Sequence, residues 1–177
     1  MKIAALDAQY REIQNDDVQD GGAVGSVACV TFEKFTDAKA AFELTTIVQG
    51  VESYTPGEFW RRELPCLLAA LRQLERLPEI VIVDGYVWLD DIGRKGLGAH
   101  LHDALNGRAA VLGVAKQPFR GSAHAIPVLR GTSRQPLYIT SEGIPARDAA
   151  SAIASMHGKH RIPTLLKRVD QLCRAGL

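Results

Sequence analysis

The chain has 177 residues, of which 46% are hydrophobic and 23% are charged. This composition excludes a disordered chain, and the length suits one domain with a substantial core, which we expect to span residues 1–177. The formal net charge of +1 excludes a surface that attracts polyanions everywhere, so any nucleic-acid contact must come from local basic patches.

Three β-strands are expected at the start of the chain. The segments 2–10, 21–32 and 41–50 are rich in apolar or β-branched residues, and short polar turns separate them. The sequence therefore predicts an antiparallel meander of three strands.

An amphipathic helix follows these strands. Leucine recurs with helical spacing at Leu64, Leu67, Leu68, Leu71 and Leu74. Pro65 is compatible with this helix if it falls in the first turn, where its missing N–H is not needed. We therefore expect the helix to begin close to Glu63 and Pro65.

Strands and helices alternate through the rest of the chain. The expected elements are a strand at 79–85, a helix at 96–107 closed by Gly107, a strand at 109–116, a hairpin at 125–131 and 135–141, and helices at 146–158 and 163–176. Three strands followed by alternating strands and helices predict an α/β domain with a mixed sheet.

The last helix carries most of a basic segment. Its cationic residues are Lys159, Arg161, Lys167, Arg168 and Arg174, and Asp170 is its one acidic residue. The segment is either a patch that binds nucleic acid or an ordinary solvated helix face, and charge alone does not separate the two.

The cysteines and the apolar runs indicate the compartment. Cys29, Cys66 and Cys173 lie far apart and form no motif with metal-ligand spacing, which is typical of buried free thiols in a reducing compartment. The N-terminal apolar run is too short for a signal peptide, and no run approaches the ~20 apolar residues of a membrane span. We expect a cytoplasmic protein without a membrane partner, and the oligomeric state stays open.

Two aspartates end predicted strands. Asp7 ends the first strand, and Asp84 ends the strand at 79–85, where Gly85 begins a turn. If these strands are neighbours, the carboxylates meet at one edge of the sheet, where open α/β sheets form ligand crevices. They repel each other unless a cation lies between them or one takes a proton, and Mg²⁺ suits carboxylate and phosphate oxygens. The alternative for Asp84 and Gly85 is an ordinary turn.

Glu63 is a candidate third carboxylate. The leucine pattern places it near the edge of the buried face of its helix, close to where the helix begins. The alternative is an acid in the first helical turn, favoured only by the helix dipole.

Several segments form a combination that is more specific than any single motif. They are LDAQY, SYTPGEFWRRELPCLLAAL, IVIVDG, GLGAHLHDAL, VLGVAK, QPLYITS and HRIPTLLKRVDQL. This combination resembles the endonuclease V family, the deoxyinosine 3′ endonucleases, over nearly the whole chain. The resemblance implies a ribonuclease H-like fold, with a mixed sheet flanked by helices, and a metal-dependent phosphodiesterase.

The resemblance also implies roles for catalytic residues. Asp7, Glu63 and Asp84 stand where the family has its acidic site, which implies Mg²⁺ as the cofactor, with Mn²⁺ able to substitute. Lys116 stands where the family has a lysine near the scissile phosphate. Metal ions polarise a phosphate and lower the pKa of the attacking water, and a lysine neutralises phosphate as a point charge.

A second implied set would contact nucleic acid. Tyr54, Pro56 and Gly57 belong to the loop that the family uses as a wedge, which fills the space left when an inosine base is turned out of the stack. Gly85 follows Asp84 in the VDG block and, with Lys116, is expected at the nucleic acid.

The chain departs from the family pattern in two segments. The family usually carries a histidine after VDG and another in a GHR block, but here the segments read YVWLDDIGRKGLG and ITSEGIPARDAA. The nearest basic residues are Arg94, Lys95 and Arg147. Asp90 and Asp91 either add a metal contact or form an ordinary polar loop.

The sequence therefore predicts a Mg²⁺-dependent endonuclease that cleaves DNA or RNA 3′ to inosine or deoxyinosine in nucleic-acid repair. One alternative is a nuclease of the same fold with a different substrate. The other is a nucleic-acid-binding protein with little catalysis, although a pure binder has no need to gather three carboxylates beside a phosphate.

Overall fold

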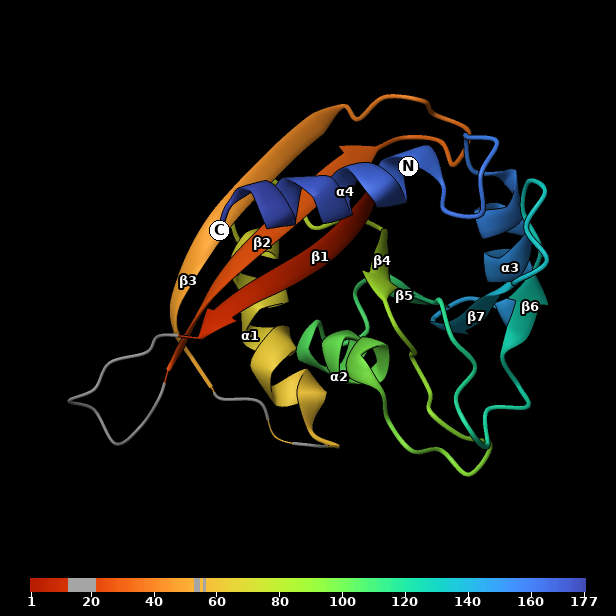
Figure 1. Ribbon diagram of the computed structural model, residues 1–177, viewed down its shortest axis with the longest axis horizontal. Helices are drawn as coiled ribbons and strands as arrows, with labels where there is room; N and C mark the ends of the chain where they lie inside the picture. The colour runs from red at the N-terminus through yellow and green to blue at the C-terminus, as the bar shows by residue number, and fades with distance from the viewer. Residues whose placement is uncertain (13–21, 53–54, 56) are drawn as a thin grey trace.

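A mixed sheet of seven strands runs through the computed structural model, which describes residues 1–12, 22–52, 55 and 57–177. The strands lie in the order β3-β2-β1-β4-β5-β7-β6 (Figure 1). The elements are β1 Ile3–Glu12, β2 Ala23–Phe32, β3 Phe42–Val51, α1 Phe59–Leu71, β4 Ile80–Asp84, α2 Leu97–Ala104, β5 Ala110–Ala115, β6 Ile126–Val128, β7 Leu137–Glu142, α3 Ala146–Ser155 and α4 Thr164–Ala175. The predicted α/β domain with a mixed sheet flanked by helices is confirmed.

The pairing of the strands follows the expected pattern. β1, β2 and β3 form the antiparallel meander, and β4 lies parallel to both β1 and β5. β6 and β7 form the predicted late hairpin, which joins the sheet through antiparallel pairing of β7 with β5.

Helices cover both faces of the sheet. α1 and α2 pack on the face that carries Ala4 and Leu6, whereas α3 and α4 pack on the face that carries Ile3 and Ala5. Figure 1 shows α4 crossing in front of β1 and β2, with α1 behind them. Because side chains alternate along β1, Asp7 belongs to the α4 face.

Two expectations about element boundaries are wrong. β1 does not end at Asp7 but continues to Glu12, because β2 pairs with it along its whole length. α1 begins at Phe59, so Pro65 lies inside the helix rather than in its first turn. Pro65 is exposed, and the carbonyl that it leaves without a donor can bind water.

Further expectations concern cysteines and membrane spans. Cys29, Cys66 and Cys173 are free and buried, as predicted. Within the described ranges, no helix has the length and apolar character needed to cross a bilayer.

Candidate active site

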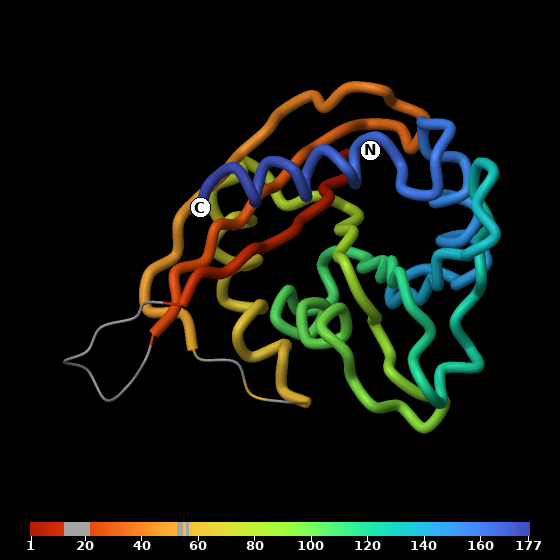
Figure 2. Tube along the Cα trace, in the orientation of Figure 1, coloured from red at the N-terminus to blue at the C-terminus, as the bar shows by residue number. Residues whose placement is uncertain are grey.

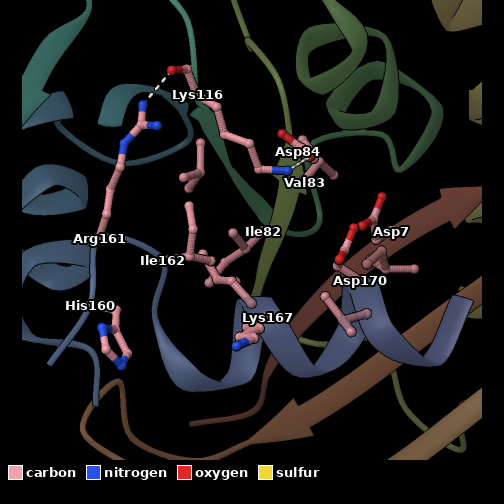
Figure 3. A pocket seen from close by; sticks show the side chains of 14 residues that line it. Asp7, Ile82, Val83, Asp84, Lys116, His160, Arg161, Ile162, Lys167 and Asp170 are labelled. Carbon is pink, nitrogen blue, oxygen red and sulfur yellow. Dashed lines mark hydrogen bonds and ion pairs between the residues drawn. The ribbon is translucent and has the colours of Figure 1, made fainter. Parts of the chain in front are cut away.

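The two predicted aspartates lie where β1 and β4 separate. Parallel pairing of these strands ends at Leu6 and Val83, and the next residues are Asp7 and Asp84. Both aspartates line a cleft of about 380 Å³, with Asp84 next to the end of β5 and Asp7 facing α4 (Figure 3). The strands are therefore neighbours, as the crevice prediction required.

Asp7 is a buried carboxylate with little compensation. Only 8% of the residue is exposed, and its Oδ1 accepts one hydrogen bond, from the backbone N–H of Ala8 at 2.8 Å. Burial first, and then the charge of Asp84, raise the pKa of Asp7 to about 6. The protein therefore holds Asp7 in a place where its negative charge is unfavourable.

Glu63 is not among the residues that line this cleft, and it lies on the buried face of α1. It is the fifth residue of the helix, so the alternative of a first-turn acid does not apply. Only 4% of Glu63 is exposed, and its Oε2 has no hydrogen-bond partner within the described ranges. Burial first, and then the charges of Asp7 and Asp84, raise the pKa of Glu63 well above its ordinary value. Glu63 is thus electrostatically coupled to both aspartates.

The neighbouring Arg62 is directed away from Glu63. Its guanidinium lies over the ring of Tyr10, 4.1 Å from the centroid, and its Nη2 pairs with Glu12 Oε1 at 2.9 Å. Arg62 lowers the pKa of Glu63, but this effect is the smallest of those that act on the carboxyl. The negative charge at Glu63 therefore stays largely uncompensated.

Lys116 is a cation that acts on both aspartates. It follows β5 directly, and its Nζ contacts Asp84 Oδ2 at 2.5 Å (Figure 3). Burial would lower the pKa of Lys116, but the hydrogen bond to Asp84 and the charges of Asp84, Asp7 and Asp170 outweigh it and raise the pKa. The structure thus brings Lys116 together with Asp7 and Asp84.

Sequence reasoning missed Asp170, which α4 carries into the same cleft. Its carboxylate points toward Asp7 in Figure 3, and its charge contributes to the raised pKa of Asp7. Arg174 holds Asp170 Oδ1 at 3.0 Å, one turn along the helix. The available signal was a single acid directly after the buried Val169 in an otherwise basic helix.

Arg161 is a second cleft residue without a predicted role. Its Nη2 donates to the backbone carbonyl of Lys116 and, at 2.8 Å, to that of Pro136. These bonds fix the backbone from which the Lys116 side chain projects. The basic segment of the sequence therefore contributes to the cleft through its first residues as well as through its helix.

The predicted nucleic-acid residues are only partly within the described structure. Tyr54 and Pro56 lie outside the described residues. Gly57 is exposed in a turn just before α1, with φ of +82°, and Gly85 follows Asp84 with φ of +118°. Both values lie in the region that favours glycine, so a side chain at either position would strain the turn.

Comparison with known proteins identifies the family. A family model described as Endonuclease V matches residues 1–153. The chain belongs to the endonuclease V family. The endonuclease V of Streptomyces coelicolor is 30% identical over 198 residues, covering 99% of this chain and 79% of that protein. The endonuclease V of Streptomyces avermitilis gives 30% identity, with 99% and 80% covered. Family membership assigns nuclease activity on nucleic acid to this chain.

Solved structures confirm the ribonuclease H-like fold. The crystal structure of endonuclease V from Streptomyces avermitilis superposes with a TM-score of 0.73 at 29% identity, covering 99% of this chain and 81% of that one. A Ciona intestinalis endonuclease V variant, crystallised with a 23mer DNA containing an inosine followed by a ribo-adenosine, gives a TM-score of 0.74 at 18% identity, with 99% and 84% covered.

The segments that depart from the endonuclease V pattern make local contacts. Asp90 Oδ1 accepts the backbone N–H of Arg94 at 2.8 Å, and Asp91 Oδ1 pairs with His124 Nδ1 at 2.6 Å. Lys95 pairs with Asp103. None of these residues lines the cleft, and neither does Arg147. The contacts of Asp90 and Asp91 are those of an ordinary polar loop.

The chemistry of the cleft fits a hard divalent cation. Burial and the charge of Asp84 raise the pKa of Asp7, and burial and the charges of Asp7 and Asp84 raise the pKa of Glu63. One buried oxygen of Glu63 has no hydrogen-bond partner among the described residues. No three His, Cys, Asp or Glu side chains of the described ranges are close enough together to hold one ion. Mg²⁺ commonly uses only one or two carboxylates, with water and phosphate oxygens completing its shell, and Asp7 and Asp84 meet that requirement.

Proposed function

We propose that this chain is a Mg²⁺-dependent endonuclease that hydrolyses phosphodiester bonds of DNA or RNA 3′ to inosine or deoxyinosine, in nucleic-acid repair. The family supports the nuclease activity. The observation that carries the metal dependence is the uncompensated charge of Asp7 and Glu63, which are both buried and both have raised pKa values. Keeping Asp7 and Glu63 ionised in a buried site costs free energy, and a bound divalent cation would offset this cost.

The residues would divide the chemistry between them. Asp7 and Asp84 would hold Mg²⁺, for which Mn²⁺ could substitute, and the bound cation supplies Lewis-acid polarisation of the phosphate and a more acidic water. Glu63 has a free buried oxygen, from which it can hold a proton or orient water. Asp170 would add negative charge from the α4 side.

Lys116 would meet the phosphate. Its ammonium group already lies in the cleft at 2.5 Å from Asp84. A substrate phosphate competes with Asp84 for this ammonium, because both are anionic oxygen acceptors. Lys116 would therefore neutralise charge on the phosphate at the end of the cleft next to β5.

Inosine selection is the finer part of the proposal. The Ciona intestinalis relative was crystallised with inosine-containing DNA. In this chain, the wedge would be the loop of Tyr54, Pro56 and Gly57, with Gly85 beside the substrate. Tyr54→Ala should slow cleavage of an inosine-containing duplex by the worth of one stacking contact, roughly 5- to 150-fold. The loss should shrink on single strands, where no partner base has to be replaced.

A substrate panel tests the whole proposal. Labelled DNA and RNA strands and duplexes, with inosine or with matched normal bases, are incubated with Mg²⁺ or with a chelator. We expect Mg²⁺-dependent cleavage that is faster on the inosine substrates. Asp84→Asn should abolish it, whereas Asp148→Asn, which changes an exposed aspartate of α3, should not. Cleavage in the presence of the chelator would contradict the metal dependence.

A second candidate is a nuclease of the same fold with another substrate. The observation that favours it lies in the two segments without histidine. Trp88, in the segment after VDG, donates from its Nε1 to Oε2 of Glu142, in the other segment, at 2.9 Å. A contact between the two segments thus stands where the family usually carries histidines. Equal cleavage of inosine and matched strands in the same panel would select this candidate. Binding without any cleavage would select a nucleic-acid-binding protein.

A further inference from the structure

A second hollow lies beside the catalytic cleft, and we call it the basic groove. It measures about 520 Å³ and is formed by the turn at 38–40, the loop at 158–164 and one face of α4. Figure 2 shows the turn between β2 and β3 next to the segment that leads into α4. Segments far apart in the sequence thus build this surface together.

The basic groove and the catalytic cleft share a border. His160, Ile162 and Lys167 line both hollows. In Figure 3, the side chains of His160 and Lys167 lie on the far side of the cleft from the Lys116 and Asp84 pair. A chain molecule that lies in the cleft can therefore continue past these residues into the groove.

The charge of the groove is positive. Lys39 and Lys167 are exposed, and neither has an ion-pair partner among the described side chains. The acidic residue of the groove, Glu43, is bound by Arg168 through two hydrogen bonds of 2.9 and 2.6 Å. This bidentate contact lowers the pKa of Glu43 and cancels its charge, so the two lysines remain available to anions.

Both walls of the groove are held in place. On one side, the buried Arg130 donates to the carbonyls of Gly158 and His160, at 3.1 and 3.0 Å, and so fixes the loop. On the other side, Asp37 Oδ2 accepts the backbone N–H groups of Glu33 and Lys34 and closes the turn that precedes Lys39. The lysines therefore project from segments that do not need to be ordered on binding.

We propose that the basic groove binds the sugar–phosphate backbone of the nucleic-acid strand on one side of the cleaved bond, with Lys39 and Lys167 against successive phosphates. This inference rests on the proposed function for the identity of the strand. It extends the binding surface beyond the catalytic cleft, through the shared Lys167 to Lys39, and it gives these two unpaired lysines a role.

The test is the affinity of the whole chain for fluorescent inosine-containing single strands, measured without divalent metal at several salt concentrations. Lys39→Gln and Lys167→Gln are compared with the wild type. The control is Arg72→Gln, which removes an exposed cation at the end of α1, on the opposite face of the sheet. Thermal melting checks that all four proteins are folded.

The expected effects follow from counterion release. Affinity for single strands scales with salt to about the power −0.7 for each neutralised phosphate. Each lysine substitution should therefore weaken binding about eightfold at about 50 mM salt and about threefold at about 200 mM salt, and should lower the salt slope by about 0.7. Arg72→Gln should change neither. Strands are also shortened from each end in turn, and shortening from one of the two ends should lower wild-type affinity below that of either single variant, because both lysine contacts are then lost.

The outcomes separate this inference from the proposed function. If Lys39→Gln and Lys167→Gln bind with wild-type affinity and slope, while the wild type cleaves, the groove site is wrong and the nuclease stands. If the wild type does not cleave but the lysine variants bind more weakly, the groove stands and the proposed reaction is wrong. A wild type that binds no strand overturns both.

Discussion

Arg130, which follows β6, and Glu63, in the second turn of α1, are both buried ionisable residues, with 6% and 4% exposed. Their surroundings differ. The Arg130 guanidinium donates to five backbone carbonyls, from residues 154, 156, 158, 160 and 161. Glu63 keeps an oxygen without a hydrogen-bond partner in the part of the chain that the structure describes, and burial and the charges of Asp7 and Asp84 raise its pKa.

This difference separates structural charge from functional charge. A buried ion whose hydrogen-bonding groups are all satisfied holds the chain together, and removing it leaves unpaired acceptors. A buried carboxylate that faces other carboxylates costs stability, and on the proposed function a bound cation would offset this cost. We therefore expect Arg130 to matter mainly for stability, and the carboxylates of the cleft to matter mainly for activity.

Among the changes that test this comparison, the largest expected effect is that of Asp7→Asn on cleavage. On the proposed function, Asp7 would hold the cation that polarises the phosphate, so its loss should slow cleavage by at least about a hundredfold. Cleavage rates with Mg²⁺ measure this, and Asp148→Asn serves as the matched control. Cleavage within a few-fold of the wild type would place the reaction elsewhere.

The same variant should be more stable than the wild type in the absence of metal. Because the pKa of Asp7 is raised to about 6 in the folded protein, the wild type loses stability as the pH rises from about 4 to about 6. Asp7→Asn has no carboxyl to ionise and so keeps this stability, which is on the order of 2 kcal/mol. Its melting temperature at neutral pH should therefore be higher than that of the wild type by roughly 4–8 °C. Thermal melting with a chelator across this pH range tests the sign. A lower melting temperature for the variant at pH 7 would contradict it.

Arg130→Met should have the opposite effect on stability and lower the melting temperature. It preserves the length of the side chain but leaves buried carbonyls without donors, which should cost about 3 kcal/mol. For a chain of this size, the melting temperature should fall by roughly 6–12 °C. Arg134→Met, at an exposed position four residues away, should change it little. If Arg130→Met and Arg134→Met had the same melting temperature, Arg130 would not stabilise the fold, and its contrast with Glu63 would fail.

Glu63→Gln should combine a smaller loss of cleavage with a gain in stability. Its amide cannot accept a proton from water, so cleavage should fall roughly 10- to 100-fold. The folded protein keeps the glutamate pKa well above its ordinary value, so removal of the charge should raise the metal-free melting temperature at pH 7. A loss of stability would mean that Glu63 has a structural role instead.

The smallest effect is expected at an exposed pair. His124 Nδ1 lies 2.6 Å from Asp91 Oδ1, and this hydrogen bond lowers the pKa of Asp91. The stability from this contact is present at neutral pH and is lost as the pH falls through the lowered pKa of Asp91. Solvent screens such a pair, so His124→Gln should shift the melting temperature by less than about 2 °C and leave cleavage unchanged. If His124→Gln and Arg130→Met lowered the melting temperature by similar amounts, burial would not determine how much a charged contact stabilises this protein.

Local pattern was enough to predict most of the fold. The apolar runs of β1, β2, β4 and β5 and the leucine spacing of α1 indicated elements that the structure contains. Asp7 and Asp84 do follow the last paired residues of β1 and β4, although β1 itself continues to Glu12. The start of α1 was misplaced because a proline usually lies near a helix start, whereas here tertiary packing on the sheet holds the helix on both sides of Pro65.

The parts that were missed depend on contacts between distant segments. Asp170 enters the cleft only because α4 folds back across β1. The lone acid in a basic helix marks the residue, but it does not show which strand the helix crosses. Arg161 similarly meets the carbonyl of Lys116, 45 residues away in the sequence. Periodicity and motif spacing contain no information about such contacts, whereas the burial of Glu63 could be inferred from its place beside the leucine stripe.

The most direct test of the central claim, that the carboxylates of the cleft are compensated by a divalent cation, is a calorimetric titration of Mg²⁺ into the substrate-free wild type and into Asp84→Asn. We predict a binding event in the wild type that is lost in Asp84→Asn and kept in Asp148→Asn. Mg²⁺ should also raise the melting temperature of the wild type but not that of Asp84→Asn. Equal binding by the wild type and Asp84→Asn, or no binding by a wild type that cleaves, would contradict the account.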